Sequence, residues 1–129
     1  MFKDEFDLAY TARKNAYSPY SNYTVGAVLK TKSGKFYTGC NIENGGIQSI
    51  CAERVAFAKA LSEGERDFEA IFVVGGNKDS HSTEECLPCG YCRQFMKEFV
   101  KDDFKIVTSD GNDVKTYTIE DLLPHGFKL

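Results

Sequence analysis

The chain has 129 residues, a formal net charge of −3 and 42% hydrophobic residues, which is enough for the core of one compact domain. No apolar run approaches the roughly 20 residues of a membrane-spanning helix. No Lys/Arg cluster offers the basic face that a nucleic-acid binder needs. The N-terminal ten residues carry scattered charges and predict no secretory signal. We therefore expect a cytoplasmic protein without a membrane or nucleic-acid partner.

The N-terminal half of the chain predicts one helix followed by a hairpin. Apolar residues at helical spacing indicate a helix at 3–17, which the segment around Pro19 would end. Two β-rich runs at 23–31 and 35–42 flank the turn KSGK, and this pattern is typical of a hairpin. A glycine-bearing loop, ENGGIQ, follows the second strand.

The rest of the chain alternates helices with strands. A helix is expected at 50–64, with Ser49 as its cap and Gly64 closing it. The remaining predicted elements are a buried strand at 69–76, a helix at 89–100, strands at 104–109 and 115–119, and a last helical turn at 120–124. This order, α-β-β-α-β-α-β-β-α, predicts an α/β fold of three layers, α-β-α, around a mixed five-stranded sheet.

The five cysteines carry most of the chemical information. Their odd number in a chain without a secretory signal favours metal ligands or catalytic thiols over disulfides. Cys89 and Cys92 lie three residues apart at a predicted helix start, where the helix dipole lowers a thiol pKa. This C-x-x-C spacing alone suits zinc as well as it suits a thioredoxin-type redox pair.

A second motif, CAE, adds a third thiol and a carboxylate. Cys51 also lies at a predicted helix start, and Glu53 follows it by two residues. Three thiolates from two helix N-termini would leave the fourth zinc position to water, as in catalytic zinc sites. Glu53 would be close enough to move protons without binding the metal. A cation, Arg54 or Arg93, would offset the charge of the thiolates.

The other thiols and the two histidines have ordinary interpretations. Cys40 ends a strand and is expected to pack as a small apolar residue, and Cys86 is expected to be a loop thiol. His81 and His125 are expected at the surface. Two rival functions remain open at this point. One is a structural zinc module closed by Cys40, Cys86 or His81, and the other is a thiol oxidoreductase.

Several spaced motifs together resemble a known family. CAE followed by PCGYC matches the zinc deaminase signature, His/Cys-x-Glu and then Pro-Cys-x-x-Cys. YSPYSNYTVGA, TGCNIENGG, PCGYCRQF and LLPHGF resemble further landmarks of the small, homotetrameric, three-cysteine cytidine deaminases. The resemblance runs from about Tyr17 to Phe127, in the family's order.

The resemblance implies one cytidine deaminase-like catalytic domain over residues 1–129, with one Zn²⁺ per subunit. The implied reaction is hydrolytic deamination of cytidine and 2′-deoxycytidine in pyrimidine salvage. The implied site residues are Cys51, Cys89 and Cys92 as zinc ligands, Glu53 as proton shuttle, Asn41 and Glu43 at the ribose, Tyr23 and the backbone of Ala52 at the base, Arg54 with Gln94 offsetting the thiolate charge, and Phe127 stacking on the base from a neighbouring subunit. The last role implies a homotetramer with composite sites.

The sequence departs from the family pattern in the loop after NIEN. Ile47 lies near the place where the family commonly has tyrosine, and the segment 41–51 is one residue short. The family pattern therefore does not predict which residues contact the sugar 5′-hydroxyl, or how this part of the subunit interface is built. Blasticidin S, a cytosine-bearing antibiotic, is an alternative substrate, although NIEN favours an ordinary nucleoside. The acidic composition disfavours a polynucleotide editor.

Overall fold

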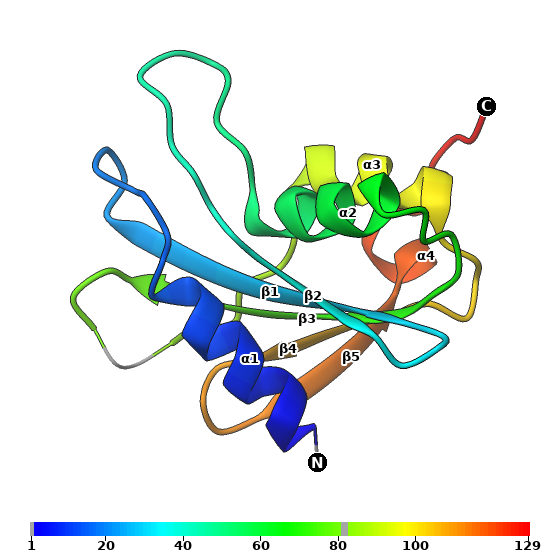
Figure 1. Ribbon diagram of the computed structural model, residues 1–129, viewed down its shortest axis with the longest axis horizontal. Coiled ribbons are helices and arrows are strands. Elements are labelled where there is room, and N and C mark those ends of the chain that lie inside the picture. Colours follow the sequence, from blue (N-terminus) through cyan, green and yellow to red (C-terminus); the bar gives the residue numbers. More distant parts are fainter. Residues whose placement is uncertain (1, 81–82) are drawn as a thin grey trace.

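The computed structural model describes residues 2–80 and 83–129, which form five strands in one sheet and four helices (Figure 1). The strands are β1 (Tyr23–Thr31), β2 (Phe36–Cys40), β3 (Phe68–Asn77), β4 (Lys105–Ser109) and β5 (Val114–Thr118). The helices are α1 (Lys3–Arg13), α2 (Ala52–Ser62), α3 (Gly90–Phe99) and α4 (Ile119–Leu122). The predicted order of elements is confirmed. None of these helices has the length and apolar character to cross a membrane.

The sheet is mixed, as predicted. Its order is β2-β1-β3-β4-β5, with β3 and β4 parallel and all other neighbours antiparallel. Parallel neighbours need a long crossover, and α3 lies in the segment that joins β3 to β4. Side chains alternate along the central strand β3, so Ile71 and Val73 enter one hydrophobic cluster while Phe72 and Val74 enter another on the opposite face.

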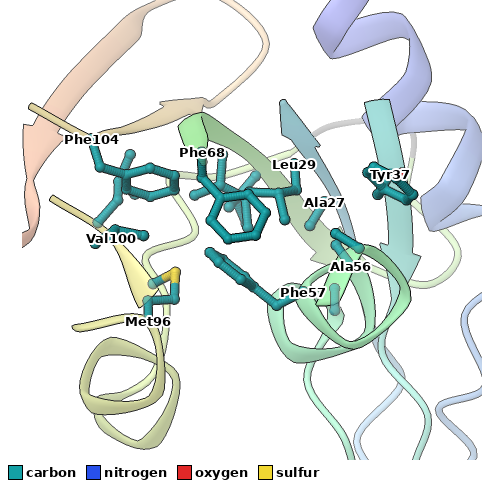
Figure 2. Packing of buried hydrophobic residues seen from close by; sticks show 14 of the residues in the cluster. Ala27, Leu29, Tyr37, Ala56, Phe57, Phe68, Met96, Val100 and Phe104 are labelled. Carbon is teal, nitrogen blue, oxygen red and sulfur yellow. The ribbon is translucent and has the colours of Figure 1, made fainter. Parts of the chain in front are cut away.

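Helices cover both faces of the sheet, which confirms the three-layer prediction. Phe6 and Ala9 of α1 pack on one face, whereas α2, α3 and α4 lie on the other (Figure 1). At the centre of the cluster that contains Ile71 and Val73, Phe57 of α2 is fully buried. Its ring centroid lies 5.1 Å from that of Phe68 and 6.1 Å from that of Phe104 (Figure 2). This packing fixes α2 on the sheet.

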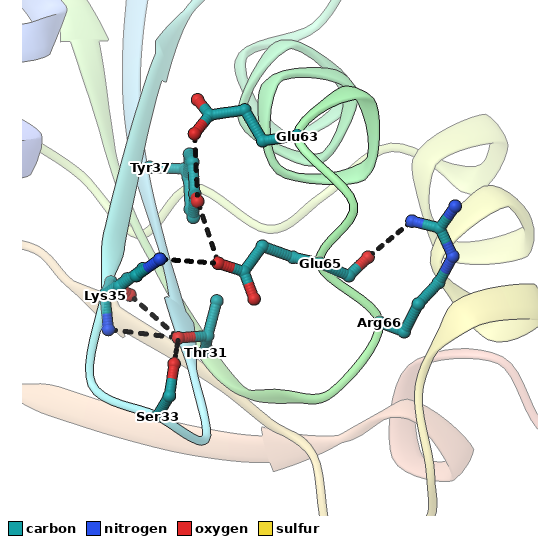
Figure 3. Close-up of polar contacts among 7 residues, drawn as sticks. All are labelled: Thr31, Ser33, Lys35, Tyr37, Glu63, Glu65 and Arg66. Carbon is teal, nitrogen blue, oxygen red and sulfur yellow. Dashed lines mark hydrogen bonds and ion pairs between the residues drawn. The ribbon is translucent and has the colours of Figure 1, made fainter.

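The two ends of α2 are held to β2 in different ways. At the N-terminal end a side chain on Gly39 would place its Cβ only 2.3 Å from the carbonyl oxygen of Ala52, so glycine allows the helix to approach the strand. At the C-terminal end the Tyr37 hydroxyl donates to Glu65 at 2.9 Å and to Glu63 at 3.4 Å, while Lys35 pairs with Glu65 (Figure 3). Burial and these carboxylates raise the pKa of Tyr37 to about 12.

The first helix is shorter than predicted. It ends at Arg13 instead of reaching Tyr17. The backbone N–H of Tyr17 donates to the carbonyl oxygen of Asn41 at 3.0 Å, and Tyr17 forms an isolated bridge with Ile42. This pairing with a distant segment replaces the helical hydrogen bonds that periodicity alone would suggest.

The predicted cap of the second helix is also wrong. The N-cap of α2 is Cys51, with extended backbone angles, and not Ser49. The Ser49 hydroxyl instead accepts a hydrogen bond from the backbone N–H of Asn44 within the preceding loop. At the other end, Gly64 follows the helix with a φ of +94°, as predicted for a glycine that ends a helix.

Candidate metal centre

Three thiols meet where α2 and α3 begin. The sulfur of Cys51 lies 3.6 Å from that of Cys89, and Cys89 lies 3.4 Å from Cys92. All three sulfur atoms lie within 4.8 Å of one another. Two sulfurs bonded to one tetrahedral zinc at about 2.3 Å would lie roughly 3.8 Å apart. The cluster therefore fits a single metal ion, and the structure brings together the three predicted ligands.

The helix termini bring the thiols together. Cys51 is the N-cap of α2 and Cys89 is the N-cap of α3. Cys89 was expected within the first turn of its helix, and it lies one residue before that turn. The Cys89 sulfur accepts from the backbone N–H of Cys92 at 3.5 Å. Both helices lie on the same face of the sheet (Figure 1), and their positive N-terminal dipoles favour thiolates at this point.

Hydrogen bonding between the thiols shifts their protonation. Cys92 and then Arg54 donate toward the Cys51 sulfur, and together they lower the pKa of Cys51 to about 5 despite its partial burial. The same contact with Cys51, together with burial, raises the pKa of Cys92. A proton thus stays on Cys92 in the metal-free chain, and metal binding would release it.

Glu53 lies beside the thiols, two residues into the α2 segment. Its side chain is buried, with only 4% of the residue exposed. Burial, and to a lesser degree the negative charge of Cys51, raises the pKa of Glu53 to about 7. A carboxyl group that is close to half-protonated near neutral pH can both accept and donate a proton.

A cavity of about 340 Å³ opens next to this carboxyl group and the thiols. Its lining contains Ser21, Tyr23, Val25, Asn41, Glu43, Cys51, Ala52, Glu53, Cys86, Leu87 and Cys89. Ala52 is the first residue of α2, and a backbone N–H at that position has no acceptor within its own helix. Tyr23, Asn41, Glu43 and Ala52, all predicted at the substrate, thus line one cavity with the metal site.

Asn41 and Glu43 also organise the chain around the cavity. The Asn41 amide accepts from the backbone N–H of Val25 at 2.8 Å and donates to the carbonyl oxygen of Tyr23 at 2.9 Å. The Glu43 carboxylate accepts from the backbone N–H groups of Tyr20 and Ser21 and from the Ser21 hydroxyl. Each side chain keeps one hydrogen-bonding position for a ligand, because an amide has a second N–H and a carboxylate has about four acceptor sites.

The two candidate cations differ in what they contact. Arg54 donates from Nη2 to the Cys51 sulfur at 3.9 Å and to the carbonyl oxygen of Ser49 at 3.2 Å. Arg93 is directed elsewhere, since Nε donates to the carbonyl oxygen of Pro88 and Nη1 to that of Leu122. The structure therefore favours Arg54 as the charge near the thiols and gives Arg93 a role in fixing the start of α3.

Gln94 and Phe127 lie together outside the cavity of their own chain. The Gln94 amide donates to the carbonyl oxygen of Phe127 at 2.8 Å, and both residues line a shallow surface hollow with Tyr91 and Phe95. Within residues 2–80 and 83–129, no hydrogen bond joins Gln94 to a thiol, and its effect on their charge stays a prediction. Phe127 is 64% exposed, and its contact with the base in a neighbouring subunit stays a prediction.

The remaining thiols and histidines lie apart from the metal cluster. In the described part of the chain the cluster contains three donor residues, and neither Cys40 nor Cys86 belongs to it. Cys86 has a role that the sequence did not indicate: it lines the cavity and packs against Gly75, and burial raises the pKa of its thiol to about 12. His125 has no place in the cluster, and His81 lies outside the described residues.

Comparisons with known proteins agree with this site. Residues 3–108 match the family model for the cytidine and deoxycytidylate deaminase zinc-binding region. The chain is 42% identical over 118 residues to a cytidine deaminase of Sporosarcina psychrophila, covering 90% of this chain and 83% of the relative. It is 34% identical over 108 residues to a blasticidin-S deaminase of Bacillus cereus, covering 81% and 76% of the two chains.

A solved structure shows the same fold. The crystal structure of cytidine deaminase from Burkholderia pseudomallei superposes with a TM-score of 0.86 at 42% identity, covering 98% of this chain and 99% of that one. The family model and the cluster of Cys51, Cys89 and Cys92 together identify zinc as the cofactor. The chain belongs to the cytidine and deoxycytidylate deaminase family of zinc enzymes.

Proposed function

We propose that this chain catalyses the hydrolytic deamination of cytidine and 2′-deoxycytidine to uridine and 2′-deoxyuridine, with release of ammonia. The observation that carries the proposal is a buried carboxyl group, Glu53, that faces a nucleoside-sized cavity beside three converging thiols. Family membership supports the reaction type, and named cytidine deaminases among the relatives support the substrate.

In this proposal Cys51, Cys89 and Cys92 hold the zinc ion. Zinc, when bound, supplies a nucleophile from water near neutral pH. Glu53 takes the proton of the attacking water and delivers it to ring N3, which makes C4 of the base more electrophilic. After the hydroxyl has added to C4, Glu53 takes its remaining proton and passes it to the amino nitrogen, so that the C4–N bond breaks, ammonia leaves and C4 keeps a carbonyl oxygen. Burial raises the pKa of this carboxyl group in the metal-free chain above that of an exposed glutamate, and this direction suits a group that both accepts and donates a proton.

The cavity lining positions the substrate. The backbone N–H of Ala52 donates to the carbonyl oxygen of the base, and the ring of Tyr23 flanks the pyrimidine. The second amide hydrogen of Asn41 and the remaining acceptor site of Glu43 bind the ribose 3′-hydroxyl region. These roles are supported by the shared cavity and by the hydrogen-bonding positions that each side chain keeps.

The test compares Glu53→Gln with the parent protein. The substitution keeps the size of the side chain and removes the titrating group, so zinc content stays at one ion per chain. We expect kcat for cytidine to fall by about 10²–10⁴-fold or more, the range of general acid–base catalysis. Glu98→Gln, on the exposed side of α3, is the matched control and leaves kcat unchanged. A Glu53→Gln protein with parental kcat would remove Glu53 from the reaction.

The same assay distinguishes a nucleoside deaminase from a deaminase of a cytosine-bearing antibiotic. The Bacillus cereus relative is named for blasticidin S, which carries the same cytosine ring. We expect kcat/KM for cytidine and 2′-deoxycytidine to exceed that for blasticidin S, because Asn41 and Glu43 offer hydrogen bonds to a sugar hydroxyl. The reverse order would assign the chain to the antibiotic instead.

We also propose that residues 1–129 form one catalytic domain that assembles as a homotetramer with composite sites. Phe127, 64% exposed and outside the cavity of its own chain, would reach the base in a neighbouring subunit. Light scattering checks the tetramer. A mixture of Glu53→Gln and Phe127→Ala subunits checks the composite site, because a mixed interface regains one intact site. Activity that stays at the sum of the separate variants would contradict it.

The cellular setting follows from the reaction. We propose that the enzyme works in pyrimidine salvage in the cytoplasm. Unpaired cysteines throughout the described chain support a reducing compartment. Deletion of the gene should leave cells unable to use cytidine as their pyrimidine source, and unimpaired growth of such cells on cytidine would argue against this role.

A further inference from the structure

We propose that Tyr91 is a positioning residue whose ring holds the Arg54 guanidinium against the sulfur of Cys51. The role rests on the proposed function, because it tunes the metal centre at which that reaction takes place. Tyr91 does not touch the cavity; it acts through Arg54.

The guanidinium of Arg54 has few other restraints. Its central carbon lies 4.4 Å from the centroid of the Tyr91 ring, a stacked cation–π distance. Its hydrogen bonds to Cys51 and Ser49 both leave from the same nitrogen, Nη2. Its Nε is buried and has no hydrogen-bond partner in the described part of the chain. The guanidinium also interacts with the sulfur of Cys92, and the aromatic face of Tyr91 adds a restraint on the plane of the group.

The position of Tyr91 in the fold suits this role. It lies between Cys89 and Cys92 at the start of α3, whereas Arg54 lies in the first turn of α2. The stacking therefore joins the two helix ends that supply the thiols. Tyr91 is 68% exposed, so its ring contributes little to the hydrophobic core. An exposed aromatic residue that covers a partly buried cation next to metal ligands is better explained by positioning than by folding.

The contact matters because of charge. Three thiolates donate much electron density to a bound metal ion, and a cation beside the sulfurs withdraws part of it. Arg54 supplies that cation only while it stays near Cys51. Without the ring of Tyr91 the guanidinium is free to turn toward water, and the metal then activates water less strongly. The loss appears in kcat, while KM changes little because the cavity lining is untouched.

The experiment compares Tyr91→Leu with Tyr91→Phe. Leucine removes the aromatic face, and phenylalanine keeps it. Phe36→Leu is the matched control, since Phe36 is also exposed and also lies near a cation, Lys30 at 5.8 Å, at the end of β2 remote from the thiols. We expect kcat to fall by about 3- to 30-fold in Tyr91→Leu, the range of a cation–π contact, and to stay within about twofold of the parent in the other two.

A spectroscopic measurement separates this role from a loss of folding or of turnover. Replacement of zinc by Co²⁺ gives sulfur-to-cobalt charge-transfer bands, whose energy reports the charge around the thiolates. Tyr91→Leu should shift these bands to longer wavelength, in the same direction as Arg54→Ala, because a less positive surrounding raises the energy of the sulfur electrons. Adding Tyr91→Leu to Arg54→Ala should cause no further shift, since Tyr91 acts through Arg54.

Each outcome decides the role of Tyr91. Unshifted bands and parental kcat in Tyr91→Leu would overturn it, as would equal losses in the leucine and phenylalanine variants. A further shift in the double variant would show that Tyr91 acts independently of Arg54, which also overturns it. If the parent shows the cobalt bands but leaves cytidine unchanged, the proposed function fails, and the band shift in Tyr91→Leu still tests the positioning role.

Discussion

The close contact between β2 and α2 at Gly39 connects the stability of the fold to the metal site. In Gly39→Ala the new Cβ would lie 2.3 Å from the carbonyl oxygen of Ala52 and 2.7 Å from the backbone nitrogen of Ala56. Ordinary contacts of a Cβ begin at 3.4 Å, so backbone atoms must move by about 1 Å. Because the obstructing atoms are backbone, α2 has to shift as a unit and carries Cys51 with it.

We expect Gly39→Ala to lower the free energy of unfolding by about 3 kcal/mol, the upper range for overpacking. At roughly 4 °C per kcal/mol for a domain of this size, the melting temperature falls by about 12 °C. Zinc content at 25 °C should also fall, because the Cys51 sulfur moves away from Cys89 and Cys92. Urea unfolding and metal analysis of the same samples measure both effects.

Two further glycines serve as controls. Gly26→Ala meets the carbonyl oxygen of Ala9 at 2.0 Å, so it should be at least as destabilising, but it displaces α1 on the opposite face and leaves zinc content intact. Gly90→Ala meets nothing within 4 Å and should be harmless. If Gly39→Ala kept parental stability and zinc content, or lost no more zinc than Gly26→Ala, the reasoning would be refuted.

Two other predictions concern the polar contacts that hold α2 and α3. The folded protein raises the pKa of Tyr37 from its ordinary value of 10.0 to about 12. The neutral hydroxyl therefore stabilises the fold fully below pH 10, and this contribution is lost as the pH rises through 10 to 12. Tyr37→Phe should therefore lose less stability than the parent over that pH range in urea titrations, and parallel curves would argue against the contact. Arg93→Lys keeps the charge but cannot reach both Pro88 and Leu122, so we expect a loss of about 1–3 kcal/mol in unfolding free energy; parental stability would contradict that role.

Local pattern was sufficient for much of the fold. Helical spacing, β-rich runs and turn residues predicted the helices and strands in order, and two cysteine motifs at predicted helix starts gave Cys51, Cys89 and Cys92 as candidate metal ligands, which the structure brings together. The predictions failed where a long-range contact decides the local structure. Tyr17 leaves the helix because it pairs with the segment around Ile42, and that pairing has no local signal.

The site contains further features that depend on tertiary packing. Residue type favours Ser49 as the helix cap, but Ser49 contacts Asn44 in the loop and Cys51 takes the N-cap position. The stacking of Tyr91 on Arg54 joins two helices whose relative placement is set by the sheet. The position of Cys86 in the cavity wall likewise depends on the course of the segment between β3 and α3. None of these contacts has a fixed spacing along the chain.

X-ray absorption at the zinc edge of the purified protein tests the central claim most directly. The account predicts one zinc ion per chain with three sulfur neighbours at about 2.3 Å and one oxygen neighbour at about 2.0 Å, the pattern of an open site beside Glu53. A zinc ion enclosed by four protein ligands, or a protein that holds no zinc, would contradict it.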